Sequence, residues 1–161
     1  MIFVTVGTHE QPFDRLVRYM DLWAGEHDEE VIMQTGFTDY EPQNCTWRKL
    51  FHYDEMTQNI KNARIVITHG GPSSFMAVIQ AGKTPIVVPR LHELGEHVNN
   101  HQLEFCRALK QRGGNLILVE KIEELGDVVA QYSEREKDGP FKSHNAAFCE
   151  AFGKIVDELM R

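Results

Sequence analysis

The amino-acid sequence predicts an α/β protein with a doubly wound, mostly parallel, Rossmann-like sheet of about six strands. Short, continuously apolar runs alternate along the chain with segments whose apolar residues recur at helical spacing. This alternation is typical of parallel strands joined by crossover helices that cover both faces of a sheet. The length of 161 residues, 42% of them hydrophobic, suits one globular core. Residues 1–161 are therefore expected to form a single domain.

The chain begins with a strand and an amphipathic helix. Ile2–Val6 is an apolar run that ends at Gly7, which predicts a buried strand. Apolar residues then follow at helical spacing, and Pro12 is expected in the first turn of this helix. The apolar face of this helix consists of Phe13, Leu16, Val17, Met20 and Trp23.

The next segments predict a second strand, a long loop and a second helix. Val31–Met33 reads as a strand closed by Gly36, and residues 37–46 as a loop. Trp47–Phe51 is a weaker strand candidate, and Met56–Ala63 predicts a short helix.

The pattern is sharper in the middle of the chain. Arg64–Thr68 is a β-branched strand that leads through a turn at His69–Ser74 into a helix ending near Ala81. Thr84–Pro89 is a fully apolar strand bracketed by prolines. The helix that follows is expected to place Val98, Phe105 and Leu109 on one side and to end at Gly113 and Gly114.

The last third of the chain predicts one more strand and two helices. Leu116–Val119 reads as the final strand, and Ile122, Leu125, Val129 and Tyr132 fit one helix. A terminal amphipathic helix is expected at about residues 141–160. This helix could pack on a partner chain or cover the domain's own sheet.

Charge and hydropathy exclude several classes of function. The formal net charge of −7 argues against a nucleic-acid partner. Met1–Val4 enters a strand-like run without a basic segment, so no signal peptide is expected. No apolar run approaches the roughly 20 residues that a membrane-spanning helix needs. Any membrane contact is therefore expected to be peripheral or to come from a partner.

The first candidate site follows the first strand, because ligands of doubly wound sheets bind beyond the carboxyl ends of the strands. Gly7 would let a ligand approach the backbone closely, and Thr8, His9 and Glu10 would line the sheet edge. His9 and Glu10 could act as an acid–base pair. Alternatively, this segment is only a turn, with Thr8 as a helix cap. The GxGxxG dinucleotide motif is absent from the chain.

The second candidate is the turn His69-Gly70-Gly71-Pro72-Ser73-Ser74, which has the features of an anion site. The two glycines leave backbone N–H groups accessible, and Pro72 begins a helix whose N-terminus carries partial positive charge. Ser73 and Ser74 could add hydroxyl donors, so a diphosphate would fit. A capped turn without a ligand is the alternative.

The third candidate is the polar segment His92–Gln102. Its carboxylate and amide side chains could bind ribose or sugar hydroxyls through paired hydrogen bonds. Its three histidines also raise the possibility of a metal site, but the spacing is not HExxH and no cysteine is near, so no metal is expected. The alternative is a solvated helix start.

Together these motifs resemble a known family. The turn His69–Ser74, the run Ala81–Pro89 and the triplet Asn100-His101-Gln102 resemble the C-terminal half of GT-B-fold glycosyltransferases, in particular the glycosyltransferase family 28 C-terminal domain. The segment Val4–Leu16 narrows the resemblance to small bacterial exopolysaccharide and capsule glycosyltransferases that work with a membrane-associated partner. The resemblance covers about residues 1–130.

The resemblance implies that a UDP-sugar lies across the strand ends. The donor-binding residues would include Gly7 and Thr8 in the first segment and His69, Gly70, Gly71, Ser73 and Ser74 in the second. In the third segment His101 and Gln102 would grip the donor sugar, with Asn100 and Glu96 nearby. Many relatives carry a ribose-binding glutamate where this chain has Ala77, so Glu93 or Glu96 is expected to bind the ribose instead.

The implied activity is that of an inverting, metal-independent hexosyltransferase without a cofactor. It would transfer a sugar from the UDP-sugar to a lipid-linked saccharide in polysaccharide biosynthesis. His9 would be the base, with Glu10 orienting or replacing it, unless the base lies on a partner. A GT-B enzyme has two such domains, so a membrane-associated partner subunit is expected to hold the acceptor. The chain would be cytoplasmic and recruited by that partner to the inner face of the plasma membrane.

Two alternatives stay open from the sequence. One is a non-catalytic UDP-sugar-binding or regulatory subunit of a glycosyltransferase complex. The other is a different nucleotide-dependent α/β enzyme, such as part of a sugar-nucleotide epimerase.

Overall fold

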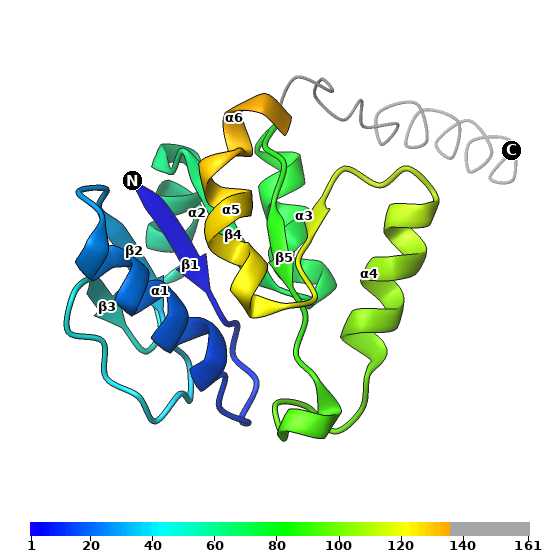
Figure 1. Ribbon diagram of the computed structural model, residues 1–161, viewed down its shortest axis with the longest axis horizontal. Helices are drawn as coiled ribbons and strands as arrows, with labels where there is room; N and C mark the ends of the chain where they lie inside the picture. The colour runs from blue at the N-terminus through cyan, green and yellow to red at the C-terminus, as the bar shows by residue number, and fades with distance from the viewer. Residues whose placement is uncertain (136–161) are drawn as a thin grey trace, which may run out of the picture.

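A computed structural model of the chain describes residues 1–135, which contain one six-stranded sheet (Figure 1). The strand order is β3-β2-β1-β4-β5-β6, and every neighbouring pair is parallel. The predicted doubly wound parallel sheet is therefore confirmed. The strands are β1 (Ile2–Thr5), β2 (Val31–Gln34), β3 (Thr46–Arg48), β4 (Ile65–His69), β5 (Ile86–Val88) and β6 (Ile117–Leu118). The terminal helix predicted at 141–160 lies outside the described residues.

Helices cover both faces of the sheet, as Figure 1 shows. The helices are α1 (Asp14–Glu26), α2 (Tyr53–Asn62), α3 (Pro72–Gln80), α4 (His101–Gln111), α5 (Leu125–Ala130) and α6 (Tyr132–Arg135). Two short 3-10 turns, η1 (His92–Leu94) and η2 (Ile122–Glu124), precede α4 and α5. The core divides accordingly, with α1 and α5 packed on one face and α2, α3 and α4 on the other.

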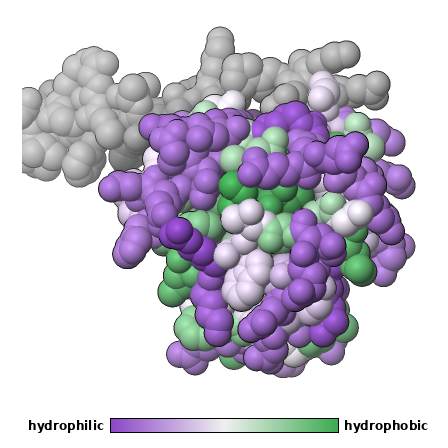
Figure 2. All heavy atoms as spheres, turned by 90° about the vertical axis from the view of Figure 1, so that its left-hand side faces the viewer, coloured by the Kyte–Doolittle hydropathy of each residue, from purple (hydrophilic) through white to green (hydrophobic). Residues whose placement is uncertain are grey.

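The side-chain alternation of the strands explains this two-sided core. In β1, Ile2 and Val4 pack on the α1 face while Phe3 packs on the α2 face, and all three are fully buried. Continuous apolar strands therefore have a partner on each side, as expected of a parallel sheet. Figure 2 views the molecule from the β2–β3 side and shows mostly hydrophilic residues around a smaller hydrophobic area.

The direction of the winding changes between β1 and β4, and this change determines where a crevice opens at the edge of the sheet. From β1 the chain moves outward to β2 and β3, then returns to β4 on the other side of β1 and continues to β5 and β6. The two central strands lie in register, with Thr5 beside Thr68. Their carboxyl ends diverge into separate loops, which opens a crevice at this edge of the sheet.

Four details of the sequence prediction were wrong. Ile122, Leu125, Val129 and Tyr132 were expected in one helix but lie in η2, α5 and α6. Helix α1 begins at Asp14, so Pro12 lies before its first turn, and the backbone N–H of Phe13 donates to Thr38 Oγ1 instead. The third strand is shorter and earlier than Trp47–Phe51. Val98 lies before α4 and is exposed, so it is not part of that helix's buried face.

Candidate functional site

A cavity of about 840 Å³ lies at the carboxyl edge of the sheet where the winding changes direction. Its volume falls in the range of small-molecule sites in proteins, roughly 300–1,000 Å³. Its lining combines polar strand ends with apolar residues of the surrounding loops. These residues are Thr5, Gly7, Thr8, His9, Glu10, Gln34, Leu50, Phe51, Met56, His69, Ser73, Ser74, Val98 and Gln102.

His69 stands at the centre of this cavity, at the end of β4. The backbone N–H of Gly71 donates to its Nδ1 (3.1 Å), and its Nε2 lies 3.0 Å from Ser74 Oγ. Because an N–H can only donate, Nδ1 is unprotonated and Nε2 carries the hydrogen. Burial is the main reason that the pKa of His69 falls to about 4, with the positive charge of Arg90 second. At neutral pH the ring is therefore neutral and donates to Ser74.

The absence of side chains at two glycines makes room for this ring. A Cβ at Gly7 would overlap the imidazole, with Cδ2 and Cε1 of His69 both 2.9 Å away. A Cβ at Gly71 would meet the same ring, with Nε2 at 2.9 Å. Gly7 also has a φ of 75°, which disfavours any side chain. The glycine that ends β1 and the second glycine of the turn therefore both serve to seat His69.

Helix α3 begins at the floor of the cavity. Gly71 is its N-cap, Pro72 occupies its first turn, and Ser73 and Ser74 both line the cavity. The sequence predicted accessible N–H groups at the two glycines, but that of Gly70 donates to Gln102 and that of Gly71 donates to His69. Pro72 has no N–H and that of Ser74 donates to the Gly71 carbonyl, so among the described N–H groups from Gly70 to Ser74 only that of Ser73 is left for a ligand. The helix dipole adds partial positive charge there. This end of α3, with two hydroxyls beside it, can therefore bind the oxygens of an anion.

Arg90 provides a full positive charge below the cavity. The residue is completely buried, and its guanidinium donates to the backbone oxygens of Val6 (2.9 Å), Gln11 (2.7 Å) and Glu96 (3.0 Å). Burial lowers its pKa to about 10, so it stays protonated at neutral pH. Among the described residues that line the cavity there is no lysine or arginine. Arg90 therefore ties the loop after β1 to the loop after β5 and leaves a positive field at the site.

Comparison with known proteins decides the family. The sequences described as "Glycosyltransferase family 28 C-terminal domain" match residues 1–159 of the chain. The chain belongs to this family. A relative from Homo sapiens, "UDP-N-acetylglucosamine transferase subunit ALG13", is 30% identical over 123 residues. The match covers 70% of the chain but only 10% of that relative, so the chain spans about a tenth of its length.

A similar solved structure is the glycosyltransferase SnogD from Streptomyces nogalater. It shares 18% identity and a TM-score of 0.49, over 74% of this chain and 30% of that chain. The family match confirms the resemblance found in the sequence, and with it the prediction of a glycosyltransferase domain.

In this family 28 domain, His9 stands beside His69 at the cavity rim. Its ring contacts that of His97 in a tilted arrangement, with centroids 4.5 Å apart and an interplanar angle of 38°. The backbone N–H of Gln11 donates to its Nδ1 at 3.2 Å. Burial, then the neighbouring His97 and Arg90, lower the pKa of His9. Thr8 and Glu10 are exposed and line the same cavity, so the first predicted segment lies where the sequence placed it.

Gln102 is the only residue of the third predicted segment, His92–Gln102, that was expected to bind the donor and also lines the cavity. Its side-chain oxygen accepts from the backbone N–H groups of Gly70 (3.0 Å) and Arg90 (3.2 Å). It thereby joins the ends of β4 and β5. The group that it can offer a ligand is its NH₂.

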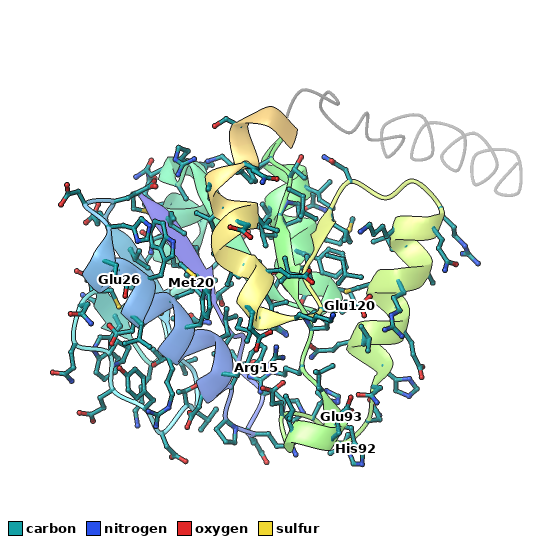
Figure 3. The ribbon with its side chains drawn as sticks, viewed as in Figure 1. Arg15, Met20, Glu26, His92, Glu93 and Glu120 are labelled. Atoms are coloured by element: carbon teal, nitrogen blue, oxygen red, sulfur yellow. The ribbon has the colours of Figure 1, made fainter. Side chains whose placement is uncertain are left out.

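The other predicted donor ligands of this segment lie outside the cavity lining. Glu96 is buried and forms a two-pronged ion pair with Arg15 of α1, at 2.8 and 2.9 Å. Glu93 accepts from the amide of Asn100, and the side chain of His101 is 78% exposed. Figure 3 shows Glu93 at the lower edge of the molecule, away from the sheet. A role for these four residues in donor binding stays a prediction, and the carboxylate of Glu96 is already occupied by Arg15.

The structure also adds residues that the sequence did not single out. Leu50, Phe51 and Met56 form an apolar wall of the cavity, while Arg15 and Arg90 hold its loops. A charged residue two positions after the apolar strand β5, behind Pro89, was the one visible signal for Arg90. Within residues 1–135 no three His, Cys, Asp or Glu side chains are grouped to hold a metal ion. No helix in that range is long and apolar enough to cross a membrane.

Proposed function

We propose that this family 28 domain binds a UDP-sugar in the cavity at the end of β1 and β4 and transfers the sugar with inversion and without a metal. The observation that carries the proposal is the convergence of Gly7, His69, Ser73 and Ser74 on one cavity at the N-terminus of α3. This constellation suits a diphosphate, since it offers the hydroxyls of Ser73 and Ser74 and the backbone N–H of Ser73 in the field of buried Arg90.

Room for the nucleoside lies next to this cavity. A second cavity of about 400 Å³ between α2 and α3 shares Thr5, Met56, Ser73 and Ser74 with the first. Its lining includes Ala77, the position where many relatives carry a ribose-binding glutamate. We place the uridine there, the diphosphate at Ser73 and Ser74, and the sugar in the larger cavity near Gln102.

The reaction would be a direct displacement at the anomeric carbon. The acceptor hydroxyl loses its proton to a base, its oxygen bonds to that carbon, and the bond to the phosphate oxygen breaks with its electron pair leaving on UDP. The start of α3 would stabilise the departing charge. His9 and Glu10 are the two candidate bases on this chain, and a partner subunit could supply another.

The acceptor would be a lipid-linked saccharide held by a membrane-associated partner subunit, which would bring this domain to the inner face of the plasma membrane. The human relative's description as a transferase "subunit" supports a multi-chain enzyme. The apolar side chains of Leu50 and Val98, 52% and 65% exposed, lie at the cavity and suit contact with a second chain.

The first test is calorimetric titration of the full chain with UDP, comparing wild type with Ser73→Ala. A single lost hydrogen bond to a charged group is expected to weaken binding by about tenfold or more. Arg48→Ala, at an exposed position outside the cavity lining, is the matched control and should bind UDP like wild type. Equal affinity of Ser73→Ala and wild type would contradict the site. Incubation with a panel of UDP-sugars, a membrane fraction carrying the partner and lipid-linked acceptor then separates a transferase from a subunit that only binds.

A further inference from the structure

Three histidines at the carboxyl edge share one backbone arrangement. In each case the backbone N–H two residues later donates to the ring Nδ1. The pairs are Gln11 to His9 at 3.2 Å, Gly71 to His69 at 3.1 Å, and Asn99 to His97 at 3.4 Å. In each case the donor and the acceptor are only two residues apart, so the contact depends on the conformation of that loop alone.

This arrangement fixes which nitrogen of His9 carries the hydrogen. A backbone N–H cannot accept, so Nδ1 of His9 must present its lone pair to Gln11. A neutral imidazole then holds its single hydrogen on Nε2. An imidazolium would carry hydrogens on both nitrogens and would lose this contact. His9 is thereby held neutral, with Nε2 as a donor.

The surroundings of His9 also oppose a positive charge on its ring. The ring of His97 contacts that of His9 at a tilt, buried Arg90 and the ring of His69 lie close by, and only Glu10 favours the charged form. These neighbours lower the pKa of His9, in agreement with the neutral ring that the hydrogen bond requires. In residues 1–135 no hydrogen-bond partner of its Nε2 is present, whereas Nε2 of His69 contacts Ser74.

Glu10 differs from His9 in each of these respects. It is exposed, and it is the only carboxylate among the described residues that line the cavity. A carboxylate oxygen of Glu10 can accept a proton directly. In His9, by contrast, Nε2 already carries a hydrogen and the lone pair of Nδ1 accepts from Gln11, so the ring has no lone pair left for a proton from the acceptor.

We propose that His9 and Glu10 divide the chemistry, with His9 donating its Nε2–H to a phosphate oxygen of the departing nucleotide and Glu10 accepting the proton. This assignment rests on the proposed function. The acceptor O–H proton moves to the Glu10 carboxylate as the new C–O bond forms and the phosphate oxygen leaves with its electron pair. His9 keeps its hydrogen throughout and stabilises the developing negative charge by a charge-assisted hydrogen bond.

The tautomer is testable on the full chain without any partner or substrate. Long-range ¹H–¹⁵N spectra of histidine-labelled protein, with His9 assigned through the His9→Gln variant, distinguish protonated from unprotonated ring nitrogens. At pH 7 we expect an unprotonated Nδ1 and a protonated Nε2. A hydrogen on Nδ1, or an imidazolium, would overturn the proposal even if UDP binds as proposed.

The donor role is tested by titrating variants with UDP and with uridine. His9→Ala should weaken UDP binding about tenfold or more and leave uridine binding unchanged, because uridine has no phosphate. His9→Gln keeps a neutral N–H donor and should recover part of the loss. His27→Ala, at the exposed histidine that directly follows α1 and lies outside the cavity lining, is the control and should match wild type. Equal weakening for uridine would show a merely structural role. Absence of UDP binding in wild type would instead refute the proposed function, without changing the spectra.

The base is tested by Glu10→Gln with partner and acceptor present. This variant should bind UDP at least as tightly as wild type, since a negative charge near the diphosphate is removed, while transfer falls by about 100-fold or more. Transfer at the wild-type rate would overturn the assignment of Glu10.

Discussion

Replacing Gly7 by alanine should destabilise the fold in two ways, through the positive φ of its backbone and through contact with the His69 ring, and a control glycine separates the two. The backbone there has a φ of 75°, which costs a non-glycine residue about 1–2 kcal/mol. The added Cβ would also overlap the imidazole of His69, whose Cδ2 and Cε1 would lie 2.9 Å away. That ring is fixed by Ser74 and by the backbone of Gly71, so it cannot move without losing both contacts. Overpacking of this kind adds roughly 1–3 kcal/mol.

Gly82→Ala is the matched control, since its φ is 79° and nothing lies within 4 Å of a Cβ there. Urea unfolding followed by circular dichroism should show a loss of about 1–2 kcal/mol for Gly82→Ala and about 2–5 kcal/mol for Gly7→Ala. Calorimetry should show UDP affinity kept in the first and reduced in the second. Equal losses of stability and unaltered UDP affinity in both variants would show that Gly7 does not make room for the His69 ring.

Three further predictions concern the contacts around the cavity. Gln102→Leu should lower the free energy of unfolding by about 2 kcal/mol in chemical denaturation, because two buried N–H groups lose their acceptor; no loss would contradict this. Arg15→Met should cost about 3 kcal/mol by leaving Glu96 buried without its partner, whereas Arg48→Met, at an exposed pair with Glu55, should cost less than about 1 kcal/mol; similar values would contradict this. Between pH 7 and pH 5 the free energy of unfolding of wild type should fall by about 2 kcal/mol more than that of His69→Gln. The reason is that the unfolded chain binds a proton at His69 from about pH 6.5, whereas the folded chain binds it only near its pKa of about 4. Parallel pH profiles of the two proteins would contradict this.

The fold followed from the sequence because the strands β1, β4 and β5 are buried on both faces and read as apolar runs. The edge strand β3 is more exposed, and its position was predicted less well. The predicted ends of helices were wrong where a hydrogen bond to a residue far away in the sequence determines them. Helix α1 starts late because the N–H of Phe13 bonds to Thr38, a residue 25 positions away. In α4 the exposed Phe105 and the buried Gln102 reverse the apolar pattern, because the Gln102 oxygen accepts from backbone N–H groups in the loops that follow β4 and β5.

The candidate site was predictable where chemistry is local to the chain. The loop after β1 and the turn after β4 both line the cavity, because glycines and hydroxyls at strand ends are visible in sequence. Glu96 was expected to bind ribose, but its carboxylate pairs with Arg15, 81 residues away. No local spacing reveals such a pairing, nor the four backbone carbonyls that Arg90 gathers below the site.

The most direct test of the central claim is a crystal structure of the chain with UDP. We expect the diphosphate at the N-terminus of α3, within hydrogen-bond distance of Ser73 or Ser74 and beside His9. Nucleotide bound elsewhere on the chain, with this cavity free of it, would show that the cavity is not the UDP site.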